Sequence, residues 1–292
     1  MVNTETPLFQ QADFWEKAWQ EERRRSLYGR RRGERDGISY WNRRAGHFSR
    51  MAGAEEGKRR AAKIIHYLSH HGGLERELEI LDIGCGPGNY ALPLASRAHK
   101  VVALDPAEEM LALLKERAAK EGVTNIEAVQ MTWEDVDLDK QGWRGRFDLV
   151  LALMSPGIKD TDTLKKMIAA SRDACLLAGH LRQEISGREE LWRKLVGGEM
   201  PAIPADVLYI FHILYAWGYC PSLEVERIVN TREMEPEQAV EEFEIFFYPH
   251  LELTPSMRRT IIDYVQSRLV NGRYLSRRDM TVGYLFWGVN LH

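Results

Sequence analysis

Apolar side chains recur with a helical period near the start of the chain. One aromatic stripe is formed by Phe14, Trp15, Ala18 and Trp19. A second periodic segment covers residues 58–71, and glycines near 33 and 37 indicate breaks between helices. We therefore predict an N-terminal helical cap, residues 1–57, whose aromatic stripe packs on the rest of the protein.

From residue 79 onward, short apolar runs alternate with helical segments. This alternation is the signature of a mostly parallel sheet covered by helices. The predicted strands cover 79–83, 100–104, 126–130, 147–152 and 175–181. The predicted helices between them cover 90–98, 107–121 and 161–172. We expect one doubly wound α/β domain over residues 58–292.

The pattern becomes less regular in the last third of the chain, where we expect helical insertions within residues 189–271. The predicted elements there are an apolar helix at 206–219, a strand at 223–229, an acidic helix at 235–247, a helix at 256–270 and a last strand at 280–289.

A glycine-rich turn follows the first predicted strand, where ligands of open α/β sheets bind. Gly84, Gly86 and Gly88 let the main chain approach a ligand, but the third glycine comes one residue too early for a dinucleotide site. Asp82, at the entrance of the turn, suits a positively charged ligand such as S-adenosylmethionine better than a pyrophosphate. Asp105 ends the second strand and can accept hydrogen bonds from both hydroxyl groups of a ribose.

Over about residues 78–185 the sequence resembles the class I S-adenosylmethionine-dependent methyltransferases, which have a seven-stranded Rossmann-like sheet. The D-x-G-x-G-x-G pattern of that family is matched by Asp82, Gly84, Gly86 and Gly88. The resemblance implies that this loop, with Cys85 in it, holds the methionine part of the cofactor and that Asp105 binds its ribose. The resemblance further implies cofactor contacts at Pro106, Met110, Thr132, Trp133, Glu134 and Leu153.

One position departs from the family, which often has an acidic residue where this chain has Thr132. We expect Trp133 and backbone N–H groups to contact the adenine instead; the alternative for Trp133 is simple packing in the core. We also expect Tyr40, next to Trp41, to fold over the cofactor as a lid.

Methyl transfer from a sulfonium needs alignment more than a base. Where the acceptor needs a base, His180, His212 and Glu184 are the candidates by chain position. The fourth strand is followed by Met154-Ser155-Pro156-Gly157. This segment lacks the N-P-P-Y-like tetrad of base amino-methylating relatives. It also lacks the Pro-Cys pair needed for a cysteine adduct on a pyrimidine carbon.

The aromatic residues of 206–219 indicate an apolar cavity, so we expect a small, partly apolar acceptor. These aromatic residues are Tyr209, Phe211, Tyr215, Trp217 and Tyr219. Packing of the helix alone is the other interpretation. Two further hypotheses remain: an RNA or protein methyltransferase that uses the Arg-rich N-terminus, or a regulator that binds S-adenosylmethionine without turnover. A nicotinamide dehydrogenase is the least favoured reading.

Composition and charge limit the class of protein and the partners it can have. The chain has 292 residues, of which 44% are apolar and 28% charged, as in globular proteins. Residues 1–60 carry 14 Lys or Arg against 9 Asp or Glu, although the whole chain has a net charge of -3, so nucleic-acid binding is not favoured. Three scattered cysteines and no readable signal peptide suggest the cytoplasm. His66 and His70 are four residues apart without further ligands, so we expect no metal.

Overall fold

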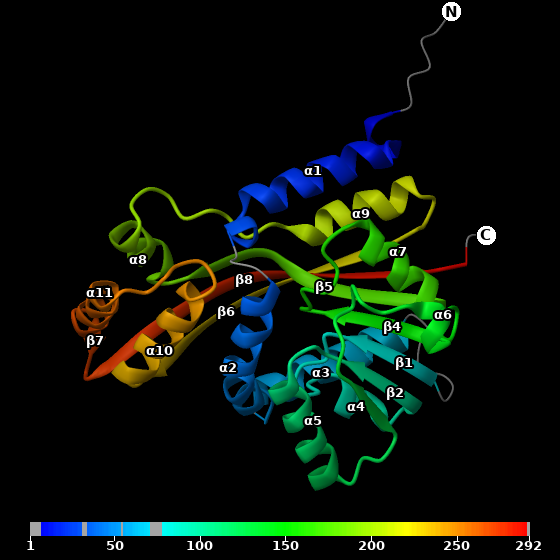
Figure 1. The fold of residues 1–292 in the computed structure, drawn as a ribbon, viewed down its shortest axis with the longest axis horizontal. Helices are drawn as coiled ribbons and strands as arrows, with labels where there is room; N and C mark the ends of the chain where they lie inside the picture. Colours follow the sequence, from blue (N-terminus) through cyan, green and yellow to red (C-terminus); the bar gives the residue numbers. More distant parts are fainter. Residues whose placement is uncertain (1–6, 31–33, 54, 71–77, 291–292) are drawn as a thin grey trace, which may run out of the picture.

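The computed structural model describes residues 7–30, 34–53, 55–70 and 78–290. In these residues the strands form one eight-stranded sheet in the order β3-β2-β1-β4-β5-β8-β6, with β7 paired to β8 alone (Figure 1). The strands are β1 (Leu78–Ile83), β2 (Ala98–Leu104), β3 (Ile126–Val129), β4 (Phe147–Leu153), β5 (Ser171–Ile185), β6 (Ser222–Met234), β7 (Leu269–Val270) and β8 (Arg273–Gly288). The expected α/β fold with a mostly parallel sheet is confirmed.

The first five strands are parallel, and their apolar runs are buried on both sides. Every residue of β4 is buried, and Ile80 to Asp82 of β1 pair with Leu149 to Leu151 of β4. A parallel strand needs apolar residues on both faces because helices cover both. Their carboxyl ends therefore meet at one edge of the sheet, beside the loop that follows β1.

Helices cover the two faces of this sheet. α1 (Ala12–Arg25), α6 (Leu138–Gln141), α7 (Thr161–Ala170) and α9 (Asp206–Ala216) pack on one face. α3 (Glu55–His70), α4 (Ala91–Ala95) and α5 (Glu108–Glu121) pack on the other. α2 (Glu34–Gly53) lies beside α5, and two short 3-10 helices, Leu8–Gln10 and Leu27–Arg30, flank α1. The aromatic stripe of α1 is buried at Trp19, as expected.

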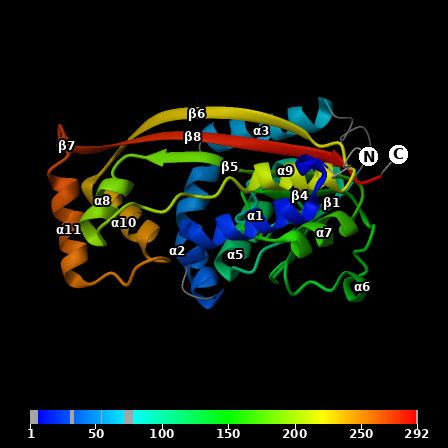
Figure 2. The same ribbon diagram turned by 90° about the horizontal axis from the view of Figure 1, so that it is seen from above.

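The antiparallel part of the sheet projects well beyond the parallel part (Figure 2). β5 continues past its last pairing with β4, at Ala178, and remains paired with β8 as far as Ile185. β8 pairs in turn with the whole length of β6. The far end of this sheet extension carries a separate apolar cluster built by α8 (Arg188–Leu195), α10 (Pro236–Phe247) and α11 (Pro255–Gln266).

Several predicted boundaries are wrong. α2 runs through Gly37, where we expected a break, and the break expected near residue 33 lies outside the described residues. The helix expected at 256–270 ends at Gln266, because the chain turns into β7. The last three long strands are each longer than predicted, since their polar residues pair within the sheet extension. The division into a cap and a catalytic domain stays a prediction.

Candidate functional site

The glycine loop after β1 is tied to the neighbouring strand. The Leu104 carbonyl accepts hydrogen bonds from the amides of Gly84 and Cys85, at 2.7 and 3.0 Å. Gly84 has a φ of 73°, and a Cβ there would lie 2.2 Å from Ser155 Oγ. A Cβ on Gly86 would meet only Met110 Sδ, at 3.9 Å. The loop is therefore packed at Gly84 and leaves room at Gly86.

The end of the loop is anchored to α5. Gly88 also has a positive φ, 79°, and a Cβ there would lie 2.3 Å from Leu114 Cδ1. Arg117 Nη1 donates hydrogen bonds to the Pro87 carbonyl at 2.5 Å and to Asn89 Oδ1 at 3.2 Å. The turn is thus held from both sides.

Asp105, at the end of β2, joins the loop to the start of α5. Its Oδ2 accepts a hydrogen bond from the Gly86 amide at 2.9 Å, and its Oδ1 accepts one from the Ala107 amide at 2.8 Å. Burial raises the pKa of this carboxyl, against the two amides, which lower it. Each carboxylate oxygen keeps a further lone pair for another donor.

Asp82 lies beneath the same loop and is 1% exposed. Its Oδ2 has no hydrogen-bond partner in the part of the chain that the structure describes. Burial, and then the charge of Asp105, raise the pKa of Asp82 to about 7. Burial and both carboxylates also raise the pKa of the Cys85 thiol. Two buried carboxylates side by side call for a positively charged partner.

An apolar cluster lies next to Asp105. Met110 and Ala107 pack with Ala45 and Trp41, both from α2. Pro106 precedes them and is half-buried. The sequence analysis missed Ala45, although its position four residues after Trp41 on one helix was a usable signal.

α2 is fixed over the start of α5. Asn42 Oδ1 accepts a hydrogen bond from the Glu109 amide at 3.1 Å. Tyr40 is buried on α2, its ring centroid lies 5.0 Å from that of Trp41, and its hydroxyl accepts a hydrogen bond from Arg44. Tyr40 and Trp41 thus belong to the helix that covers this edge of the sheet.

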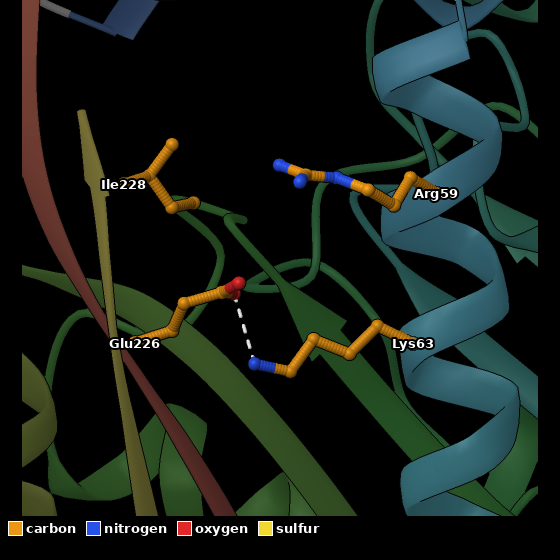
Figure 3. A pocket seen from close by; sticks show the side chains of 4 residues that line it. All are labelled: Arg59, Lys63, Glu226 and Ile228. Carbon is orange, nitrogen blue, oxygen red and sulfur yellow. Dashed lines mark ion pairs between the residues drawn. The ribbon is translucent and has the colours of Figure 1, made fainter. Parts of the chain in front are cut away.

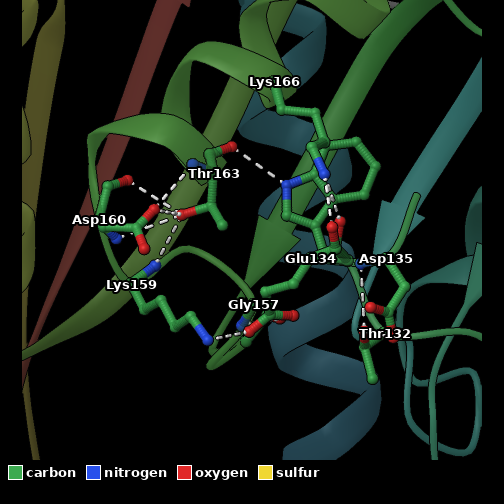
Figure 4. A network of polar contacts seen from close by, with 10 residues as sticks. Thr132, Glu134, Asp135, Gly157, Lys159, Asp160, Thr163 and Lys166 are labelled. Atoms are coloured by element: carbon green, nitrogen blue, oxygen red, sulfur yellow. Dashed lines mark hydrogen bonds and ion pairs between the residues drawn. The ribbon is translucent and has the colours of Figure 1, made fainter. Parts of the chain in front are cut away.

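The segment after β3 is a polar network (Figure 4). Thr132 Oγ1 donates to Asp135 Oδ2 at 2.6 Å, and Glu134 forms an ion pair with Lys159 at 2.5 Å. The Trp133 side chain is 2% exposed and its Nε1 donates to the Thr163 carbonyl at 3.0 Å. The Trp133 ring therefore packs in the core, so the structure favours the packing interpretation.

At the end of β4, Leu153 is buried and pairs with Ala178 of β5. Met154 follows with a φ of 58° and an exposed side chain. Left-handed backbone is costly for a residue with a Cβ and concentrates at functional sites. Ser155 then turns back against the glycine loop.

The three candidate bases lie in different places. His180 extends β5 two residues past the end of β4, and its Nε2 accepts from the Gln183 amide at 3.2 Å. Glu184 is exposed and paired with Arg182. The His212 ring stacks on Trp15 of α1 at 4.0 Å. Of the three, only His180 lies close along β5 to the edge where β4 ends.

The aromatic residues of 206–219 do not form one cavity wall, and the α-helix ends at Ala216, before the last two of them. Four of them pack against the main core, namely Tyr209, Phe211, Trp217 and Tyr219. Tyr215 is exposed. α9 itself packs on α1 and β5.

A small open pocket lies apart from the glycine loop, between α3 and β6 (Figure 3). It is lined by Arg59, Lys63, Glu226 and Ile228, and Lys63 pairs there with Glu226 at 2.9 Å. No group of three or more metal-binding side chains occurs in the described ranges. None of the helices within those ranges combines the length and the apolar character that crossing a membrane requires.

Part of the chain is similar to a known domain family. The methyltransferase domain family matches residues 80–175. A crystal structure from Bacillus halodurans C-125, provisionally named a methyltransferase, has a TM-score of 0.51 and 16% identity, and the match covers 77% of this chain and 97% of that one. At this identity the likeness concerns the fold alone.

Two curated relatives match shorter stretches. The 23S rRNA (uracil(1939)-C(5))-methyltransferase RlmD of Shewanella amazonensis is 34% identical over 106 residues, which are 36% of this chain and 23% of that protein. An uncharacterized protein of Haemophilus influenzae is 30% identical over 142 residues, which are 48% of this chain and 50% of that protein. The chain thus spans half or less of the length of these relatives. Residues 80–175, which carry the glycine loop, thus match the methyltransferase domain family, and the sheet has the same Rossmann-like α/β fold as the Bacillus halodurans protein.

Proposed function

We propose that this protein transfers a methyl group from S-adenosylmethionine to a small, partly apolar acceptor. The observation that carries the proposal is the buried pair of carboxylates, Asp82 and Asp105. Asp82 Oδ2 has no hydrogen-bond partner among the described residues. A sulfonium and an ammonium group on one ligand offset two adjacent negative charges, whereas a pyrophosphate adds to them.

The residues around this pair fit the rest of the cofactor. Gly86 has room where a side chain would otherwise stand, so the backbone of the loop is accessible to the methionine part. Asp105 offers both carboxylate oxygens to ribose hydroxyl groups. Ala107 and Met110, with Trp41, offer an apolar surface for the adenine. Pro106 directly precedes Ala107, and the amides after β3 are the remaining adenine contacts.

The bound cofactor supplies a methyl group made electrophilic by the positive sulfur. The chain has to hold the acceptor in line with that methyl group, and alignment of this kind lowers the barrier substantially. His180 Nε2 accepts a hydrogen bond from Gln183, which leaves Nδ1 carrying the proton in the neutral ring. His180 can then take a proton from an acceptor hydroxyl or amine if Gln183 moves aside.

A small acceptor is supported by the cover that α2 provides. α2 lies between α5 and the segment after α10, where the Arg43 guanidinium sits 4.5 Å from the Tyr248 ring. A partly apolar acceptor is supported by Met280 and Ile228, which are buried side by side on the sheet extension. We place the enzyme in the cytoplasm, because Cys85, Cys175 and Cys220 are free thiols.

The test is a calorimetric titration with S-adenosylhomocysteine. The wild type is expected to bind, and Asp105→Ala is expected to bind at least about tenfold more weakly, because charge-assisted hydrogen bonds to the ribose are lost. Equal affinity would remove the ribose assignment. A labelled-methyl assay over a metabolite extract then tests transfer. Binding without any transfer would favour the non-catalytic regulator.

RNA is a second candidate acceptor, because the rRNA methyltransferase RlmD is similar over 106 residues, 36% of this chain. The described basic side chains of α1 form ion pairs within the protein, which argues against RNA binding by them: Arg23 is paired with Asp206, and Arg24 and Arg25 with Glu21. The second basic cluster, 30–32, falls largely outside the described residues. RNA binding that weakens steeply with salt would favour this candidate.

A further inference from the structure

Three arginines from separate elements gather on one face of the sheet extension. Arg44 comes from α2, Arg188 begins α8 and Arg278 belongs to β8. Arg278 faces Ile185 of β5 and Asn230 of β6 in the register. Arg188 binds Gln183, which pairs with Met280, two residues from Arg278, and the charges of Arg278 and Arg44 both lower the pKa of Arg188. These elements are far apart in the sequence.

Arg188 is held in place by neutral groups. Its Nη1 donates to Gln183 Oε1 at 2.9 Å, and its guanidinium lies 3.9 Å from the centre of the Phe246 ring. No ion pair of Arg188 occurs within the described ranges. Burial, followed by the charges of Arg278 and Arg44, lowers the pKa of Arg188 to about 9.

A carboxylate of α10 lies beside the cluster. Glu242 of α10 forms ion pairs with both Arg278, at 2.8 Å, and Arg232, at 3.0 Å. The side chain of Arg278 is 14% exposed. Arg188 has no such ion pair in the described residues, and a positive charge in a partly buried place is costly without an anionic partner.

The cluster is connected to the edge where transfer takes place. Gln183 accepts from Arg188 and donates to His180, so one side chain joins the arginines to the candidate base. His180 in turn lies two residues beyond Ala178, which pairs with Leu153 at the end of β4. A group held at Arg188 is thus separated from the candidate base by a single glutamine.

Resting on the proposed function, we propose that Arg188, Arg278 and Arg44 bind an oxyanion of the methyl acceptor, a carboxylate or a phosphate. The planar fork of a guanidinium matches both anions through paired N–H donors. Met280 and Phe246 border the arginines and receive the apolar part of the same molecule. The anion fixes one end of the acceptor while His180 faces the reacting end.

The first experiment titrates the protein with inorganic phosphate and, separately, with acetate, at fixed ionic strength and with saturating S-adenosylhomocysteine. The wild type is expected to bind one anion, and Arg188→Met is expected to bind it about tenfold or more weakly. Arg278→Lys keeps the charge but loses the fork, so an intermediate loss is expected. The control is Arg227→Met: Arg227 lies on the opposite face of the sheet extension, paired with Asp279, and this variant is expected to match the wild type.

Equal weakening in Arg188→Met and Arg227→Met, or no anion binding by the wild type, would overturn the inference. Unchanged affinity for S-adenosylhomocysteine in each variant shows that the fold and the cofactor site are intact. If the wild type does not bind S-adenosylhomocysteine, the proposed function fails instead.

In a second experiment, a metabolite extract is first separated on an anion-exchange resin. Each fraction is then incubated with the enzyme and S-adenosylmethionine carrying a labelled methyl group. Labelled product is expected in the retained fraction, and phosphatase treatment of that fraction distinguishes a phosphate from a carboxylate. Label confined to the unretained fraction would overturn the inference.

Discussion

At the scale of single residues, Asp82 is a buried carboxylate whose Oδ2 has no hydrogen-bond partner in the described part of the chain. Its pKa is raised to about 7 by burial and by Asp105. Because the folded-state pKa lies above the ordinary value of 3.8, the stability that protonated Asp82 contributes is complete below that value and is lost as the pH rises through 7. A bound cation reverses this preference, because it favours the ionised carboxylate.

The affinity for S-adenosylhomocysteine, which keeps an ammonium group, is therefore expected to depend on pH. It rises as the pH increases toward 7 and levels off above that, by up to about tenfold per pH unit. Calorimetry in two buffers with different ionisation enthalpies should detect proton release below pH 7. Asp82→Asn is expected to bind more weakly with a flat pH profile; an unchanged slope in that variant would assign the proton to another group.

Gly84 is a second residue whose role can be measured. Gly84→Ala places a methyl group 2.2 Å from Ser155 Oγ at a φ of 73°, so a loss of about 2–3 kcal/mol of unfolding free energy is expected. Gly142→Ala is the control: its φ is 64° and a Cβ there meets nothing within 4 Å, so only about 1 kcal/mol should be lost. Urea denaturation measures both.

The double variant with Ser155→Gly separates the clash from backbone strain. In that background the cost of Gly84→Ala should fall to that of Gly142→Ala. If the cost stays the same, the clash with Ser155 is not its cause.

At the scale of elements, the sequence pattern predicts the parallel strands well and the antiparallel ones only in part. β1 and β4 are apolar runs, and such runs mark strands covered on both faces. The outer half of β5 reads Arg182-Gln183-Glu184, which resembles a loop until its pairing with β8 is known. Strand pairing over about 100 residues of sequence is a tertiary effect that local patterns do not contain.

The candidate site likewise has one part that the sequence predicts and one part that it does not. The glycine loop and Asp105 are contiguous with strands and follow from spacing. The arginines of the Arg188 cluster come from α2, α8 and β8, so no local sequence motif predicts the cluster. The sequence does not decide whether Trp133 packs in the core or contacts the adenine, because the segment after β3 carries both a core indole and backbone amides near the sheet edge.

The attachment of α2 to α5 supplies a further prediction. α5 has no side-chain cap of its own, and Asn42 of α2 accepts the hydrogen bond of the Glu109 amide in its first turn. Asn42→Ala is expected to cost about 1 kcal/mol of unfolding free energy, whereas Asn42→Asp keeps the acceptor and adds a charge favourable to a helix N-terminus. Chemical denaturation should give Asn42→Asp a stability at or above the wild type. Equal losses in both variants would mean that the hydrogen bond is not what matters.

At the scale of the whole molecule, α1 is part of the main core although it is far from the sheet in sequence. Trp19 is fully buried, its Nε1 donates to Asp206 at 2.7 Å, and it belongs to the same apolar cluster as Leu285 and Trp287 of β8. Phe14, on the same helix, is 41% exposed. The N-terminal helix therefore stabilises the sheet from one face, while α2 covers its carboxyl edge.

Trp19→Ala is expected to lower the unfolding free energy by about 3–5 kcal/mol, because it removes a buried indole and leaves Asp206 with one partner fewer. Phe14→Ala should cost less than about 1 kcal/mol. Denaturant titrations monitored by circular dichroism, with S-adenosylhomocysteine affinity measured on the folded protein, distinguish a stabilising role from a role in binding. If α1 only supports the core, both variants bind the cofactor product as the wild type does; a loss of affinity in folded Trp19→Ala would instead place α1 in the function of the site.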